Sequence, residues 1–84
     1  MLFRSNPTVA LILRLLGDLA PEIDPTTIDL DRALRDQVEL DSMDVLDLME
    51  AVAAATGVEV PERHYPLVQS VAQLAAYTDA RRSG

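Results

Sequence analysis

VELDSMDVLDLMEAV, residues 38–52, is the stretch that most clearly indicates how this chain folds. From its middle onward, core-compatible side chains recur every three or four residues, which is the spacing of one face of an α-helix. They are Val45, Leu48, Met49, Val52 and, just beyond the quoted stretch, Thr56. Gly57 is the residue type expected immediately past a helix end, where φ becomes positive. The pattern predicts a helix over residues 42–56 with one face toward a core.

An Asp-Ser pair stands where this helix begins. If Ser42 were the N-cap, a capping box would need Glu or Gln at the position that holds Val45. If Asp41 is the N-cap, the partner position holds Asp44, an acid that also suits the positive end of the helix dipole. Asp41 is therefore the predicted cap, and the Ser42 hydroxyl is predicted to be free. Serine beside aspartate at a helix start usually only caps, although a helix N-terminus also favours a bound anion.

The face of this helix opposite the core stripe mixes large apolar side chains with acids. Between residues 36 and 62 the chain has eight acids and no base. A solvated helix face accounts for acids, but it does not account for Met43 and Leu46 beside them. The combination predicts a docking surface for a basic partner, formed by Met43, Asp44, Leu46, Asp47 and Glu50.

The rest of the sequence predicts two further long helices and one short helix. Asn6-Pro7 is typical of an N-cap followed by the first helical residue, and Pro21 ends the helix predicted over residues 7–20. Its core stripe is Val9, Ile12, Leu13, Leu16 and Leu19. Pro61 opens a short helix that Pro66 should cut short. A capping box of Ser70 and Gln73 starts the last helix, whose inward residues are Val71, Leu74, Ala75 and Tyr77 or Thr78.

The connection over residues 21–40 is unusually long for a compact domain. Its apolar residues are frequent enough to hold it on a helical core, and Asp29 or Asp31 could cap one short turn through Leu34. The elements together predict an all-α fold: a four-helix bundle of three main helices and one short helix, with a long ordered loop between the first and second helices. We expect a single domain over residues 1–84 with its core at about 7–80.

Composition narrows the possible functions. Aromatic residues are 4% of the 84 residues and apolar residues 49%, which favours packed helices. The net charge of −7 makes nucleic acid and anionic membranes poor partners. The absence of cysteine excludes disulfides, thiolate metal sites and a thiol nucleophile, and a single histidine leaves little for a zinc site. No run approaches the about 20 apolar residues of a membrane span.

Three other interpretations of the sequence are weaker. The N-terminal residues could be a signal peptide, but Arg14 interrupts the apolar run, so we expect a first helix of the folded domain. We also expect the protein to be cytoplasmic and monomeric. A hydrolase with Ser42 as nucleophile and His64 as base lacks a Gly-x-Ser-x-Gly elbow. A calcium loop at Asp29-Leu30-Asp31 lacks its remaining ligands. We expect His64 to be a surface residue of the short helix, or a contact for a group attached nearby.

The chain resembles the acyl and peptidyl carrier protein family. The residues that carry the resemblance are Leu40-Asp41-Ser42-Met43-Asp44, then Val45-Leu46-Asp47-Leu48, then Gly57-Val58-Glu59-Val60-Pro61. They are similar to the family's Asp-Ser-Leu/Met triplet, its acid-edged helix, and its glycine with an apolar-acid-apolar triplet and proline. The distance on to Ser70 and Leu74 is similar too, so the resemblance covers roughly residues 9 to 78.

The resemblance implies a specific function. Ser42 would carry 4′-phosphopantetheine, transferred from coenzyme A by a phosphopantetheinyl transferase, and the arm's thiol would hold an acyl, aminoacyl or peptidyl thioester. The protein would be a discrete carrier of fatty-acid, polyketide or nonribosomal-peptide biosynthesis and not an enzyme. An acyl- or aminoacyl-activating ligase, synthase or transferase with a basic patch would dock on the acidic face. The alternative is an acidic helical interaction module that is never modified.

The chain also departs from the family's pattern. Glu39 stands where glycine is common, and Thr56 replaces an aromatic residue whose volume Tyr65 or Phe3 could fill. Glu50 stands where a hydrophobic residue is common, and the third helix, usually acidic, reads Arg63-His64-Tyr65-Pro66. The last two changes predict partners unlike those of the housekeeping fatty-acid carrier. Alanines of the second and last helices could leave room for an acyl chain or simply pack closely.

Overall fold

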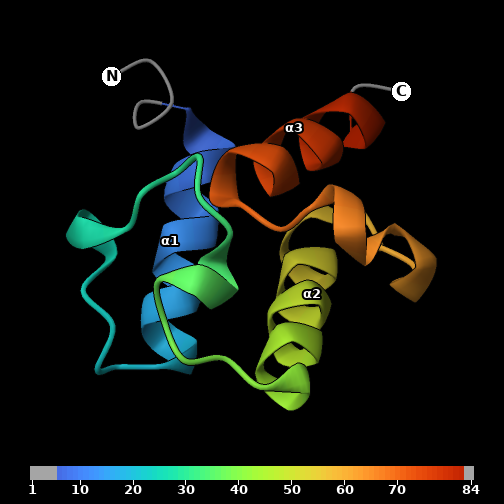
Figure 1. Ribbon diagram of the computed structural model, residues 1–84. Coiled ribbons are helices and arrows are strands. Elements are labelled where there is room, and N and C mark those ends of the chain that lie inside the picture. The colour runs from blue at the N-terminus through green and yellow to red at the C-terminus, as the bar shows by residue number, and fades with distance from the viewer. Residues whose placement is uncertain (1–5, 83–84) are drawn as a thin grey trace.

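Three α-helices form the frame of the protein, of which the computed structural model describes residues 6–82. They are α1 (Pro7–Leu19), α2 (Ser42–Thr56) and α3 (Val71–Arg82). α1 packs against both of the others; α2 runs back along it in the opposite direction, and α3 lies across one end of the pair (Figure 1). The short 3₁₀ helix η3 (Glu62–Leu67) joins α2 to α3. The predicted all-α architecture of three main helices and one short helix is confirmed.

α1 begins and ends as local chemistry dictates. The Asn6 side-chain oxygen accepts hydrogen bonds from the backbone N–H groups of Thr8 (2.7 Å) and Val9 (3.4 Å), and Pro7 is the first helical residue. The helix ends at Leu19, one residue earlier than predicted, because Ala20 already leaves the helical region at φ −135°. Pro21 cannot continue a helix, so the chain turns there.

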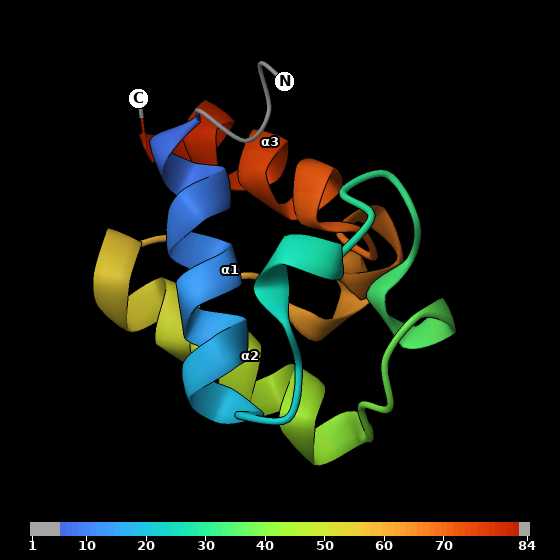
Figure 2. The ribbon, with the colours of Figure 1, turned by 90° about the vertical axis from the view of Figure 1, so that its left-hand side faces the viewer.

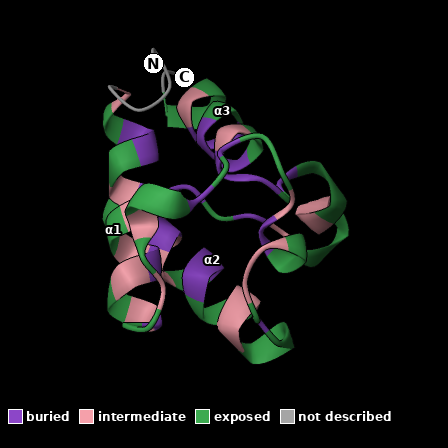
Figure 3. Cartoon of the chain, turned by 60° about the vertical axis from the view of Figure 1, so that its left-hand side comes forward, coloured by how far each residue is buried: buried purple, intermediate pink, exposed green. Residues whose placement is uncertain are grey.

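The core is drawn from every helix and from the long loop. Figure 3 shows the buried positions on the inward faces of the elements. The fully buried large side chains are Val9, Ile12, Leu16, Val52, Val71, Leu74 and Thr78. Tyr77 and Thr78 both face inward, which settles the alternative left open by the pattern. The Thr78 hydroxyl is satisfied there because it donates to the carbonyl of Leu74 at 2.8 Å.

The loop between α1 and α2 is ordered, as predicted, and it passes beside α1 (Figure 2). Backbone hydrogen bonds fix it to the start of α3: the N–H of Leu34 donates to the carbonyl of Gln69 (2.8 Å), and the N–H of Ala72 to the carbonyl of Leu30 (2.9 Å). The most deeply buried apolar side chains of the loop are Ile28, Leu30, Leu34 and Leu40. The loop therefore belongs to the same packed body as the helices.

Two single 3₁₀ turns lie in this loop, and the sequence-based description of them was partly wrong. The turn η2 (Leu34–Asp36) has no side-chain cap; the Asp29 carboxylate instead accepts from the N–H of Asp31 (3.0 Å), in the turn before η2. The turn η1 (Pro25–Thr27) was not predicted; Asp24 caps it and accepts hydrogen bonds from the N–H and hydroxyl of Thr26 (3.0 and 2.7 Å). These two bonds, the hydroxyl first, lower the pKa of Asp24.

The segment after α2 follows the predicted signals with two differences. Gly57 has φ +78°, and Ser70 and Gln73 form the predicted capping box. η3 runs one residue past Pro66, closed by a bond from the Val68 N–H to the Tyr65 carbonyl (3.1 Å). His64 is half-buried instead of fully exposed, because its Nδ1 lies 2.7 Å from the hydroxyl of Tyr77 in α3.

Candidate functional site

The N-terminus of α2 is held by a reciprocal pair of hydrogen bonds. Asp41 is the N-cap: its Oδ1 accepts from the backbone N–H of Asp44 at 2.9 Å. The Asp44 carboxylate in turn accepts from the backbone N–H of Asp41 at 3.2 Å. This is the capping box that the sequence indicated, built with aspartate at both positions. It fixes the backbone of the residue that follows the cap.

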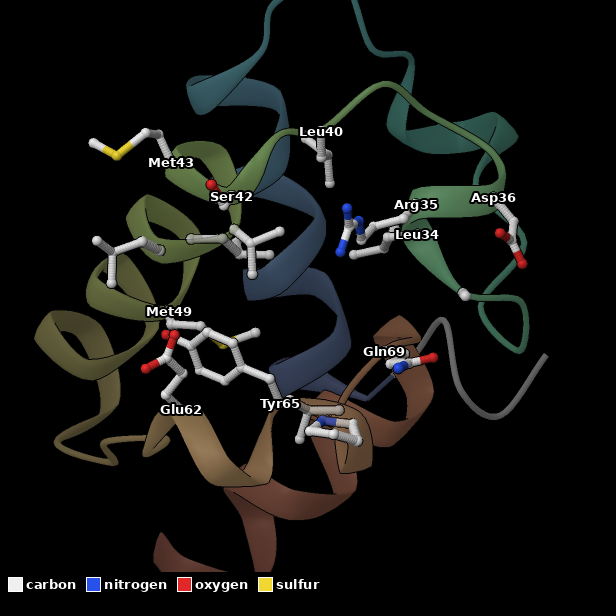
Figure 4. A pocket seen from close by; sticks show the side chains of 16 residues that line it. Leu34, Arg35, Asp36, Leu40, Ser42, Met43, Met49, Glu62, Tyr65 and Gln69 are labelled. Carbon is white, nitrogen blue, oxygen red and sulfur yellow. The ribbon is translucent and has the colours of Figure 1, made fainter.

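Ser42 is left with a free hydroxyl by this arrangement. It is the first residue of α2, it is exposed, and its hydroxyl makes no hydrogen bond to any other described residue. Because the cap and its partner satisfy each other, the hydroxyl is not needed to terminate the helix. Figure 4 shows the Ser42 oxygen at the edge of a groove.

The groove lies between α2, the turn η2 and η3, and has a volume of about 1190 Å³. Its walls are largely apolar, and α2 contributes Met43, Val45, Leu46, Leu48 and Met49. The opposite wall includes Leu34 and Leu40 from the loop and Tyr65 from η3 (Figure 4). A partly enclosed, largely apolar groove with a few polar side chains is typical of a ligand-binding site.

The predicted docking residues lie partly in the groove and partly outside it. Met43 and Leu46 line the groove, with Met43 at its rim and directed away from it (Figure 4). Asp44 does not line it; it is half-buried and belongs to the capping box. Asp47 and Glu50 are exposed but do not line it, so they lie on the outer surface of α2. Met43 is 62% exposed and Leu46 40%, and among the described residues the other exposed large apolar side chain is Leu67 of η3.

The far wall of the groove is the part that sequence reasoning missed. Arg35, Tyr65 and Gln69 line it, although they lie in segments on either side of α2 in the sequence. The apolar residues Leu34 and Leu40, which the sequence assigns to the part of the loop held on the core, are the signal in the sequence that points to this wall. Phe3, one candidate to replace the missing aromatic residue near Thr56, lies outside the described residues; the other candidate, Tyr65, is half-buried and lines the groove.

Among the described residues, no histidine lies beside Ser42 to act as a base for its hydroxyl. His64 does not line the groove, and its Nδ1 is paired with the Tyr77 hydroxyl. A serine nucleophile needs an adjacent general base and an orienting group. Ser42 and His64 are therefore not paired as the nucleophile and base of a catalytic triad.

The cap is a testable part of this site. Replacing Asp41 by alanine should lower the free energy of unfolding by about 1 kcal/mol, because the Asp44 N–H loses its partner. Urea denaturation followed by circular dichroism measures this difference. Asp47→Ala is the matched control, since Asp47 is an exposed acid of the same helix with no capping role. Equal losses in the two variants would contradict the role of Asp41 as cap.

Comparison with known proteins agrees with this geometry. A family model described as a phosphopantetheine attachment site matches residues 9–78. The chain therefore belongs to the family of phosphopantetheine-binding carrier domains, whose members carry a 4′-phosphopantetheine prosthetic group. No curated protein and no solved structure matches the chain.

The residues present fit such a prosthetic group. A phosphodiester needs an accessible hydroxyl, and Ser42 offers one without a competing hydrogen bond among the described residues. The adjoining groove gives an arm apolar walls to lie against. When bound, the group supplies a thiol, which this cysteine-free chain does not have. Within the described residues, no helix has the length and apolarity to span a membrane.

Proposed function

We propose that the protein is a carrier that holds 4′-phosphopantetheine on Ser42 and shuttles thioester-bound intermediates between biosynthetic enzymes. The observation that carries the proposal is the exposed hydroxyl of Ser42, free of hydrogen bonds to described residues, at the edge of the groove and within the matched region. The cargo is an acyl, aminoacyl or peptidyl group. Residues 7–80 act as one carrier domain, because α1, α2, α3 and the loop share a single buried core.

The chain's own part in this function is to present and shelter the group. Asp41 fixes the backbone at Ser42 through the capping box, and Leu46 and Met49 give the groove apolar walls that exclude water. The one histidine of the chain does not line the groove and is paired with Tyr77, and attachment and thioester chemistry belong to partner enzymes and the prosthetic group, so the protein itself is not an enzyme.

The outer face of α2 serves these partners. They are a phosphopantetheinyl transferase and the ligases, synthases or transferases that load and use the cargo. Asp47 and Glu50 are exposed there and would meet basic patches, while Met43 and Leu46 fill shallow apolar pockets. Contacts between exposed charges form quickly and are screened by salt, which suits a carrier that must leave each enzyme in turn.

The other candidate function is an interaction module that is never modified, because the same exposed Met43 and Leu46 would also suit a permanent binding surface. Incubation with a promiscuous phosphopantetheinyl transferase and coenzyme A separates the two. Each transfer joins the phosphorus to Ser42 Oγ and releases adenosine 3′,5′-bisphosphate and the hydroxyl proton. Intact mass spectrometry should show a gain of one phosphopantetheine, and none for Ser42→Ala.

The position of the modification can be read from one peptide. Cleavage after Arg35 and Arg63 releases residues 36–63, in which Ser42 is the only serine. The added mass should lie in this peptide. A modification that persists in Ser42→Ala would place the site elsewhere, and no mass gain in the wild-type protein would favour the unmodified interaction module.

A further inference from the structure

Among the described residues that line the groove beside Ser42, Arg35 is the one cationic side chain. It is an exposed residue of η2, across the groove from α2. Figure 4 shows its guanidinium extending from η2 into the groove toward α2, whereas the neighbouring Asp36 carboxylate is directed away. The Arg35 guanidinium makes no hydrogen bond or ion pair with another described residue; Arg32 of the same loop, by contrast, donates to the carbonyl of Asp36 at 3.2 Å.

The other charges around Ser42 are negative. Asp41 and Asp44 flank it in sequence, and both carboxylates belong to the capping box. A phosphodiester on Ser42 would add an anion next to two acids, which repel it at short range. The positive end of α2 offsets part of this repulsion, but the backbone N–H groups of Asp41 and Asp44 are already bonded within the cap. Arg35 is the counter-charge that the described lining of the groove provides.

We propose that Arg35 binds the phosphodiester of the prosthetic group attached to Ser42, and so holds the beginning of the arm in the groove between α2 and η2. This inference rests on the proposed function. A guanidinium suits the task because its planar donors can bind two phosphate oxygens at once, which a lysine ammonium does not do in the same geometry. The apolar side chains of Leu40 and Leu46, which also line the groove, strengthen the contact by limiting water around it.

The test compares modified proteins that differ at one arginine. A phosphopantetheinyl transferase and coenzyme A are used to modify four proteins: the wild type, Arg35→Gln, Arg35→Lys and Arg63→Gln. Intact mass spectrometry confirms the modification of each before any comparison. Arg63 is the matched control because it is exposed, lies on η3 and does not line the groove. Because the intact mass is checked first, a protein that is not modified counts against the proposed function. A modified protein whose spectra do not depend on Arg35 counts against this inference alone.

The readouts are the ³¹P resonance of the phosphodiester and the backbone amide resonances of residues 33–36. We expect modification to shift these amides in the wild type and in Arg63→Gln, and not in Arg35→Gln. The ³¹P resonance should move in Arg35→Gln relative to the wild type, with an intermediate position for Arg35→Lys, and stay in place for Arg63→Gln. Unmodified Arg35→Gln should unfold at the wild-type temperature, because no described residue depends on its guanidinium.

A carboxylate at the end of a cargo has the same anionic oxygen chemistry, so the cargo is varied as well. The proteins are prepared with free-thiol, butyryl and succinyl arms from the corresponding coenzyme A derivatives. Dependence of the spectra on Arg35 in all three forms supports the phosphodiester as the ligand. Dependence in the succinyl form alone would overturn it in favour of the cargo carboxylate, and identical spectra for Arg35→Gln and Arg63→Gln in every form would overturn it outright.

Discussion

Replacing Leu16 by alanine should lower the free energy of unfolding by about 2–5 kcal/mol. Leu16 has no exposed surface and lies on α1, the helix that packs against both α2 and α3. The lost apolar contacts and the remaining cavity would both destabilise the folded state. A domain of this size has a total stability of only about 4–13 kcal/mol, so the melting temperature should fall by roughly 10 °C or more. Urea denaturation and calorimetry measure the two quantities.

Leu67→Ala is the matched control for this substitution. It removes the same atoms from a side chain that is 59% exposed on η3, so the loss should stay below about 1 kcal/mol. Similar losses for the two variants would show that α1 is not the shared centre of the core. The comparison matters for function because the groove beside Ser42 is formed by elements that this core holds together.

The parts of the fold that sequence reasoning described well are those decided by neighbours along the chain. The capping box of Asp41 and Asp44 joins residues three apart, and its two bonds are present. α2 ends at Gly57, whose φ of +78° lies in the left-handed region, a conformation that glycine tolerates better than any other residue. In such cases the local competition between a few hydrogen bonds decides the conformation, and the residue types reveal it.

Contacts between distant segments explain what was missed. The Asp29 carboxylate does not cap η2 because it accepts a hydrogen bond from the N–H of Asp31 (3.0 Å), in the turn before η2. The side chain of Gln37 holds the Asp29 backbone there: it accepts from the Asp29 N–H (2.8 Å) and donates to the Asp29 carbonyl (2.7 Å). The pairing of His64 with Tyr77 joins η3 to α3. No periodic pattern encodes such pairs, because they depend on how the helices pack.

The groove was missed for the same reason. Its walls bring residues 33–40 and 62–69 to α2, so it exists only after the whole chain has folded. Sequence reasoning could assign Leu34 and Leu40 to the core but could not place Arg35 beside the helix that carries Ser42. The sequence could therefore predict the free hydroxyl of Ser42, but it could not predict the groove that would receive an attached arm.

The second large effect is expected from the outer face of α2. Replacing Asp47 and Glu50 together by lysine changes the net charge from −7 to −3, because each substitution adds two charges. Both side chains are exposed, so the fold should be retained. The rate of modification of Ser42 by a phosphopantetheinyl transferase should fall about tenfold or more at low ionic strength, because a steering attraction becomes a repulsion. The rate is measured by quenching the reaction at successive times and determining the modified fraction by intact mass spectrometry.

A control with the same change of charge separates local docking from net charge. Asp18 and Glu22 are exposed acids at the end of α1 and just beyond it, and neither lines the groove. Their double replacement by lysine also gives −3, yet it should leave the rate nearly unchanged. The difference between the two variants should shrink as salt is raised, since exposed charges are screened over about 10 Å at 0.1 M. Equal slowing by both pairs would assign the effect to total charge, and unchanged rates in both would exclude the face of α2 as the docking surface.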